Sequence, residues 1–448
     1  MVTTADHSAT AKQQVDQIID ARWIIPIEPA NVVLENHSLI IQGDRILDLL
    51  PTAEAALRYV GKRHFRLTGH VLLPGLINLH THAAMSLLRG YADDMPLMRW
   101  LQERIWPAES RNISADFVHD GTRLACWEML RGGITCFNDM YFFPQAAADA
   151  ALSAGMRAAL GITVFEFPSA YGSGADDYLR TGLAIRETLL DEPLISFCLA
   201  PHAPYTVADN SFEHVALLAD QLDLPVHIHL HETRNEIEES LKEHGVRPLE
   251  RLRRLGLLGP GLIAVHAVHL DADEIDLLAT HGCHVAHCPT SNMKLASGIA
   301  PVNALLKQGV GVGLGSDGAA SNNRLDIFQE MRHAALLAKV ANQDASSLPA
   351  HQALRMATID GARALGLDEK IGSLKIGKAA DLVAVRLDSW DLQPCYCPAS
   401  HLVYAAGREQ VSHVWVAGTL RIEDKHPVDL DIDVLLMNTK MWQNTLIN

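Results

Sequence analysis

Residues 76–82 read "LINLHTH", a short apolar run that carries two histidines, His80 and His82, one residue apart. Side chains alternate between the two faces of a β-strand. The stretch therefore predicts a strand with a polar face formed by Asn78, His80 and His82 and an apolar face formed by Ile77, Leu79 and Thr81. Histidines at the end of a strand are more often structural than metal-binding, so the other strands must decide their role.

Three further stretches share this organisation, with small or polar residues on one face and at the carboxyl end of the predicted strand. They are residues 194–206 "LISFCLAPHAPYT", 225–233 "PVHIHLHET" and 309–320 "GVGVGLGSDGAA". Between such strands lie amphipathic helical patterns, which is typical of parallel β/α units. Eight strands are expected, centred near Leu79, Phe137, Ala159, Phe197, Ile228, Ala264, Val285 and Val312.

Eight strands over about 300 residues predict a (β/α)8 barrel, in which functional groups gather at the carboxyl ends of the strands. Both ends of the chain show β-branched alternation broken by turn residues, which predicts one composite β-sandwich domain built from the N- and C-terminal segments. The predicted division is residues 1–72 and 369–448 for the β-sandwich, with a helical tail at the C-terminal end, and 73–368 for the barrel.

The composition of the 448 residues excludes several classes of partner. A net charge of -16 and the lack of a Lys/Arg run argue against nucleic acid, because binding to it rests on cationic side chains that neutralise phosphates. The first twenty residues contain no apolar segment of the kind found in a secretory signal, and no apolar run approaches membrane-spanning length. Seven cysteines without a CxxC pair favour reduced thiols and a cytoplasmic location.

Histidine or aspartate at the same end of several strands indicates a metal site. Three neutral imidazoles and one carboxylate suit Zn²⁺, with Fe²⁺ and Mn²⁺ as alternatives. His80, His82 and Asp317 are the clearest candidates. On the strand at 225–233, either His229 or His231 can supply the remaining ligand, and the pattern alone does not separate them.

Several motifs give the sequence a specific resemblance. They are "PGLINLHTH" (74–82), "HIHLHET" (227–233), "VHAVHL" (265–270), "HCPTSNMKLASGIAPV" (287–302) and "GLGSDGAASNNRLDIFQEMR" (313–332). Over about residues 70–340 the chain resembles the amidohydrolase superfamily. Within it the chain is similar to the methylthioadenosine/S-adenosylhomocysteine deaminases of the triazine-hydrolase and chlorohydrolase group.

The resemblance implies roles for individual residues. It implies that His80, His82, His229 and Asp317 hold one divalent metal ion. Glu232 corresponds to the family's acid/base glutamate, and His266 to the histidine beside the reactive water, so that Glu232, His266 and Asp317 form the catalytic set. Contacts to substrate are implied for Glu109, His202, Trp100, Glu232 and Asp317.

Two departures refine these expectations. Two-metal members of the superfamily bridge their ions through a lysine at the end of the fourth strand, and "LISFCLAPH" (194–202) has none, so one ion is expected. Members that bind the amino-acid tail of S-adenosylhomocysteine use arginines after the third strand. The corresponding stretch offers only Arg180, so a methylthio or unmodified 5′ group is better matched than a charged tail.

The resemblance therefore implies hydrolytic deamination of an adenine nucleoside, namely 5′-methylthioadenosine, S-adenosylhomocysteine or adenosine, with release of ammonia and an inosine-type product. It also implies a homo-oligomer, a dimer or a tetramer. The alternatives are a deaminase or chlorohydrolase of another heterocycle (guanine, 8-oxoguanine, cytosine or an s-triazine), an amide-ring hydrolase, and a non-enzymic zinc-binding protein.

Overall fold

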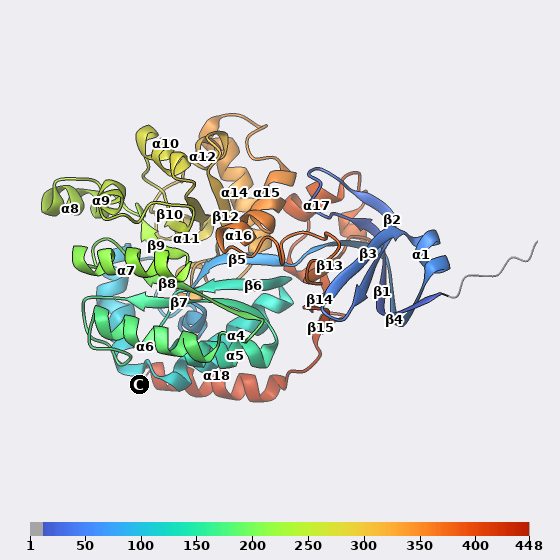
Figure 1. Cartoon of the computed structure of the whole chain (residues 1–448), viewed down its shortest axis with the longest axis horizontal. Helices are drawn as coiled ribbons and strands as arrows, with labels where there is room; N and C mark the ends of the chain where they lie inside the picture. The colour runs from blue at the N-terminus through green and yellow to red at the C-terminus, as the bar shows by residue number, and fades with distance from the viewer. Residues whose placement is uncertain (1–11, 448) are drawn as a thin grey trace, which may run out of the picture.

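The computed structural model describes residues 12–447 and contains a barrel of eight parallel strands (Figure 1). The strands are hydrogen-bonded in chain order, as expected for consecutive β/α units. All eight predicted strands and the (β/α)8 fold are confirmed. The strand bounds are β5 (Leu76–Thr81), β6 (Ile134–Asp139), β7 (Arg157–Val164), β8 (Ile195–Pro201), β9 (Val226–Leu230), β10 (Leu262–His266), β11 (His284–His287) and β12 (Gly311–Leu314).

Helices connect these strands and bury the outer face of the barrel. The principal ones are α4 (Ala115–Arg131), α5 (Pro144–Ala154), α6 (Ala175–Thr188), α7 (Asp209–Leu222), α8 (Arg234–His244), α9 (Pro248–Arg254), α10 (Ala272–Thr280), α11 (Pro289–Lys294), α12 (Val302–Lys307), α13 (Ala319–Asn322), α14 (Ile327–Asn342), α15 (Ala350–Met356) and α16 (Ile359–Ala364). The long connection after β5 contains the short helices η1 (Ala83–Leu88), α2 (Leu97–Trp100), η2 (Leu101–Ile105) and α3 (Trp106–Asn112).

The first strand, β5, corrects the predicted alternation of faces. Ile77 and Leu79 pack in one cluster with Ile263 and Val265, the neighbours of His227 and His229 on the inner face of the barrel. Asn78 instead lies against Met129 of the covering helix α4. The pairing of β5 with β6 shifts between Asn78 and Thr81, and such a bulge turns a side chain to the other face. The bulge explains why His80 still points inward.

The barrel closes where β12 meets β5, and glycines make this approach close. A Cβ atom added to Gly315 would lie 2.8 Å from His80 Cβ and 2.9 Å from the His80 backbone nitrogen. Hydrogen bonds join the two sides: the Asp317 N–H donates to the His80 carbonyl (3.0 Å), and the Asn78 side chain both donates to and accepts from Ser316 (2.7 and 2.9 Å). The small residues of 309–320 therefore allow this segment to approach β5 closely enough for the barrel to close.

Segments from both ends of the chain build a second sheet, seen beside the barrel in Figure 1. Its strands pair antiparallel except for β1 with β4. The predicted β unit shared by the two termini is confirmed, as one continuous hydrogen-bonded sheet. In spatial order the strands are β16 (His426–Pro427), β15 (Thr419–Glu423), β14 (Val411–Val416), β13 (Leu382–Arg386), β4 (Tyr59–Pro74), β1 (Gln13–Ile24), β2 (Leu34–Gln42) and β3 (Arg45–Pro51).

Beyond this sheet the chain returns to the barrel as helix α18 (Ile432–Ile447), which runs beneath α4 and α5 in Figure 1. The Trp442 indole and the Asn438 amide both donate to the Asp120 carboxylate of α4, at 2.9 and 3.2 Å. The remaining helices are α1 (Thr52–Arg58) and α17 (Pro398–Tyr404), with short turns η3 (Trp390–Leu392) and η4 (Arg408–Gln410).

The domain boundaries at 72/73 and 368/369 stay proposals, and β4 continues to Pro74 across the first of them. The predicted absence of a secretory signal rests largely on residues 1–11, which lie outside the described residues. Across residues 12–447, none of the helices has the length and apolar character needed to cross a membrane.

We expect Gly315→Ala to destabilise the barrel, because the added methyl would meet the backbone of β5 as well as side chains. Overpacking of this kind costs about 1–3 kcal/mol of unfolding free energy. Gly259→Ala is the matched control, since a Cβ there meets nothing within 4 Å. Urea unfolding of both variants measures the difference in unfolding free energy. Equal stabilities would contradict the role of Gly315 in the contact between β12 and β5.

Candidate metal centre and active site

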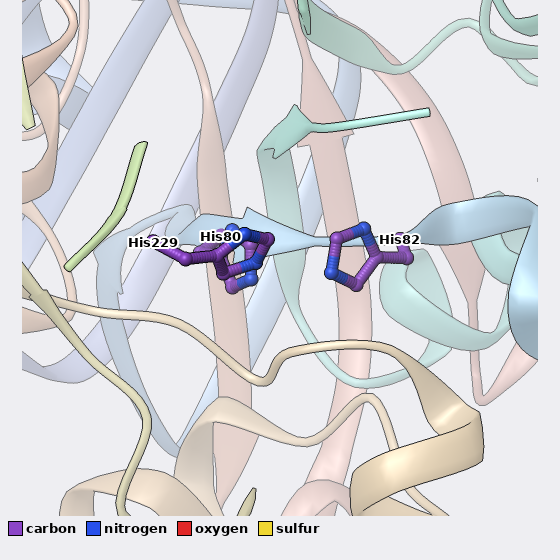
Figure 2. Close-up of side chains that lie close together, drawn as sticks. All are labelled: His80, His82 and His229. Carbon is purple, nitrogen blue, oxygen red and sulfur yellow. The ribbon is translucent and has the colours of Figure 1, made fainter. Parts of the chain in front are cut away.

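Histidines from strands on opposite sides of the barrel meet at the carboxyl ends. His80 lies near the end of β5, His82 directly follows that strand, and His229 lies in β9; Figure 2 shows their imidazoles close together. One ring nitrogen of each lies within 4.8 Å of the other two, and the same criterion groups His80 with His266 and Asp317. The predicted ligand set is thus brought together, and His266 joins it as a fifth candidate.

The outer ring nitrogens of these histidines are held by acceptors. The Nδ1 atoms of His82 and His229 lie 2.7 and 2.8 Å from the carbonyl oxygens of Met140 and His202. A carbonyl only accepts, so Nδ1 carries the proton in a neutral ring and the Nε2 lone pair faces the centre. His80 Nε2 is buried and has no hydrogen-bond partner among the described residues. A buried nitrogen without a partner, beside other ligand atoms, fits a divalent metal ion.

The Asp317 carboxylate is divided between two sets of partners. Its Oδ1 atom lies 3.3 Å from Nε2 of both His80 and His82, while Oδ2 accepts hydrogen bonds from the hydroxyls of Ser291 (2.6 Å) and Ser321 (2.7 Å). Burial alone would raise its pKa. The contacts with His80, His82 and other histidines outweigh burial and hold the pKa of Asp317 well below its usual range. Asp317 is therefore ionised at neutral pH.

Glu232 has the opposite electrostatic setting. It follows the end of β9 and is buried, and its Oε2 atom lies 3.8 Å from His266 Nε2. Burial raises the pKa of its carboxyl group. The turn that carries it is fixed by Glu236, whose carboxylate accepts from the backbone N–H groups of His231 and Glu232, each at 2.8 Å. His266 Nδ1 is bonded to the Asn292 side-chain oxygen at 2.8 Å. Two nearby carboxyls with pKa values moved apart are typical of an acid and a base.

His231 lies away from this cluster, which separates the two alternatives that the sequence left open. Strand β9 ends at Leu230, and His231 takes a left-handed backbone conformation (φ 54°) that turns its ring outward. Its Nε2 atom accepts from the Leu249 N–H at 3.1 Å, and its Nδ1 lies 3.5 Å from Glu274. His229 is the histidine of this strand that reaches the centre.

A cavity of about 620 Å³ opens above the histidines and carboxylates. Its walls are mainly aromatic and aliphatic, with Trp100, Trp106, Phe165 and Phe167 among them. Such a pocket, apolar with a few convergent polar groups, is suited to a small flat ligand. Trp100 lines this cavity, and its indole N–H donates to the Ala92 carbonyl (2.9 Å).

The two predicted nucleoside contacts both line this cavity. Glu109 is partly buried, accepts a hydrogen bond from the Tyr141 hydroxyl (2.7 Å), and has its pKa raised to about 7 by burial. His202 stacks on Phe165 with ring centroids 4.7 Å apart, and its Nδ1 lies 3.1 Å from the Thr206 hydroxyl. Arg180 lies elsewhere: it is exposed on α6 and pairs with Asp177. Within residues 12–447, the cavity lining includes neither lysine nor arginine.

The supporting residues were missed from the sequence. Ser291, Asn292 and Ser321 contact Asp317 or His266, and Glu236 holds the turn at Glu232. Their signal was present, because the first three lie in the motifs 287–302 and 313–332. Sequence alone offers no means of telling which hydroxyls and amides of such a motif face the metal cluster.

Comparison with known proteins agrees with this geometry. Residues 71–421 match the amidohydrolase family. A 5-methylthioadenosine/S-adenosylhomocysteine deaminase of Teredinibacter turnerae is 48% identical over 96% of this chain and 98% of its own length. A 5′-deoxyadenosine deaminase of Methanothermobacter thermautotrophicus is 43% identical over 87% and 90%. The crystal structure of an adenosine deaminase from Xanthomonas campestris with bound zinc superposes with a TM-score of 0.96 at 47% identity, covering 98% of this chain and all of that one.

We expect purified protein to contain one divalent ion per chain and His229→Ala to lose it, because the variant removes a ligand nitrogen from the cluster. His231→Ala, two residues further along the chain and just beyond the end of β9, is the matched control and should retain the ion, although it loses its bond to Leu249. Elemental analysis and chelator competition measure both. Loss of the ion from His231→Ala alone would contradict the assignment, and two ions per active chain would overturn the expectation of a single metal.

Proposed function

This chain belongs to the amidohydrolase family and is a hydrolytic deaminase of adenine nucleosides, and we propose that it acts best on nucleosides with an uncharged 5′ group, such as 5′-methylthioadenosine. The observation that carries the proposal is the pairing of a low-pKa Asp317 with a high-pKa Glu232 on one cavity floor beside the histidine cluster. Hydrolytic deamination needs both a proton acceptor and a proton donor at one carbon.

For the metal, we propose Zn²⁺ as the single ion, held by His80, His82, His229 and Asp317, with Fe²⁺ and Mn²⁺ as alternatives. The zinc in the Xanthomonas structure and the orphaned Nε2 of His80 support this choice. When bound, such an ion activates water as a nucleophile at neutral pH.

The protein's own groups then move the protons. The Glu232 carboxyl donates its proton to the ring nitrogen beside the amino-bearing carbon while the oxygen of water adds to that carbon. Asp317 Oδ1 accepts a proton of that water and passes it to the amino nitrogen, which leaves as ammonia. Glu232 recovers a proton from the added hydroxyl as the carbonyl of the inosine-type product forms, and His266 orients the reacting oxygen.

Glu109 and His202 are proposed to bind the nucleoside. Tyr141 occupies Glu109 Oε1, which leaves the other carboxylate oxygen for the ribose hydroxyls. Trp100 and the neighbouring aromatic walls exclude water from the base. A tail bearing its own carboxylate would find no cation in the cavity lining described within residues 12–447, so the charged homocysteine group of S-adenosylhomocysteine should bind less well.

Location and assembly are also proposals. Five of the seven thiols are buried, and no two are bonded to each other, in line with a reducing cytoplasm. A homo-oligomer is proposed because α18 exposes Leu436, Met437 and Met441, an apolar surface that association would bury.

Glu232→Gln should keep the ion and lose most turnover, because the amide preserves the shape of the side chain and cannot donate an acidic proton. We expect kcat to fall by about 10²- to 10⁴-fold. Glu238→Gln, an exposed position on α8, is the control. Ammonia release and metal content are measured together; loss of the ion from Glu232→Gln would make Glu232 a ligand, and near-normal kcat would remove it from the mechanism.

A substrate panel assayed for ammonia tests the function. Adenosine and 5′-methylthioadenosine should be deaminated much faster than adenine, guanine or cytosine, with S-adenosylhomocysteine below 5′-methylthioadenosine. The 2′-deoxy analogue should lose about ten- to hundredfold in kcat/KM, since a hydrogen bond to a charged group contributes about 1.5–3 kcal/mol. Equal rates on free bases and nucleosides would overturn the nucleoside assignment.

The same panel in Glu109→Gln isolates the ribose contact. Because the pKa of Glu109 is about 7, its ionised form dominates above that pH and is lost below it. KM for ribonucleosides should therefore rise as pH falls through 7 in the wild type and not in the variant, which should also show a smaller ribo/deoxy ratio. Glu103→Gln, an exposed residue outside the cavity, should behave as wild type. An unchanged ratio in Glu109→Gln would exclude this contact.

A further inference from the structure

Three of the four histidines around the centre have an oxygen as their outer partner. His82, His229 and His266 each direct Nδ1 to an oxygen, namely the Met140 carbonyl, the His202 carbonyl and the Asn292 side-chain oxygen. An oxygen acceptor admits only one neutral tautomer, with the proton on Nδ1 and the lone pair on Nε2. These rings are therefore fixed in the form that can bind a metal.

His80 is the exception, because its outer partner is another imidazole. Its Nδ1 atom lies 2.9 Å from Nε2 of His227, and both residues are completely buried. The rings face each other across the barrel interior, one from β5 and the other from β9, with centroids 4.9 Å apart. Either nitrogen could hold the shared proton, and only one of these arrangements leaves a lone pair on His80 Nε2.

We propose that His227 is a positioning residue: its Nε2 accepts the Nδ1–H of His80 and holds His80 in the tautomer that presents Nε2 to the metal ion. This inference rests on the proposed metal site. It requires that the proton of His227 sits on Nδ1, and that nitrogen has no hydrogen-bond partner among the described residues. Because His80 is held by a histidine and not by an oxygen acceptor, the Nδ1–H of His227 stays unpartnered among the described residues.

The environment of the pair leaves few other means of orienting His80. Gly315 lies against the backbone and Cβ of His80, so the main chain confines the side chain on that side. His80 Nε2 faces Asp317 Oδ1 at 3.3 Å. Without an acceptor at His227, the proton of a neutral His80 would be drawn to Nε2, toward the carboxylate, where it would block an ion. Outer partners of metal-binding histidines typically change metal affinity by about 10- to 100-fold.

The test compares His227→Leu, which removes the acceptor, with His227→Gln, whose amide oxygen can replace it. Zn²⁺ affinity is measured by competition with a chromophoric chelator, without substrate, and folding is followed by Tm. We expect His227→Leu to bind about 10- to 100-fold more weakly and His227→Gln to stay within about threefold of wild type. His287→Leu is the matched control, because His287 is also buried and its Nδ1 atom has no hydrogen-bond partner among the described residues. This substitution should lower Tm without weakening the binding of Zn²⁺.

Wild-type affinity in a folded His227→Leu variant would overturn the proposal, as would equal weakening in His287→Leu. If His227→Leu does not fold, the ¹⁵N shifts of the two rings in zinc-loaded wild-type protein decide the question. Protons on Nδ1 of both rings support the proposal, and a proton on His227 Nε2 overturns it. A wild-type protein that binds no divalent ion would instead refute the metal site itself, so the two failures are distinguishable.

Discussion

The close contact between the last strand of the barrel and the first is the constraint on which the active site depends. His80 and His82 belong to one side of this seam and Asp317 to the other, so the ligands meet only if β12 lies directly against β5. The absence of a side chain at Gly315 permits this close contact between the two strands. The hydrogen bonds between Asn78 and Ser316 fix the position of one strand along the other. The packing that closes the barrel therefore also sets the geometry of the active site.

Because the polar groups of the centre are buried, their hydrogen-bond partners and neighbouring charges determine their protonation and thereby their function. Away from water, a carboxylate or imidazole is governed by the few atoms that it touches. The surrounding histidines keep Asp317 charged, and two serine hydroxyls donate to its other oxygen, whereas burial raises the pKa of Glu232 and pushes it toward its neutral form. The same type of side chain can thus serve as acceptor and donor within one cavity, through neighbours alone.

Strand periodicity predicted the barrel well, because alternating apolar and small residues are visible in one dimension. It failed where the backbone departs from regular geometry. The bulge in β5 allows both Leu79 and His80 to face inward and leaves Asn78 outside, and the left-handed conformation of His231 turns that ring away from the cluster. The second partners of the site, such as Asn292 and His227, depend on distances across the barrel. A linear pattern shows which residue types are present and carries no information on those distances.

The division of the second sheet between the two ends of the chain has a consequence for biosynthesis. Strand β4 pairs with β13, and the paired residues Pro74 and Leu382 are separated by about 300 positions. At a translation rate of about 5–20 residues per second, the edge of β4 emerges from the ribosome roughly 15 to 60 s before its partner. During that interval an apolar strand edge is open to pairing with other nascent chains. Chaperone demand and aggregation in rapid overexpression should therefore concentrate on this N-terminal sheet.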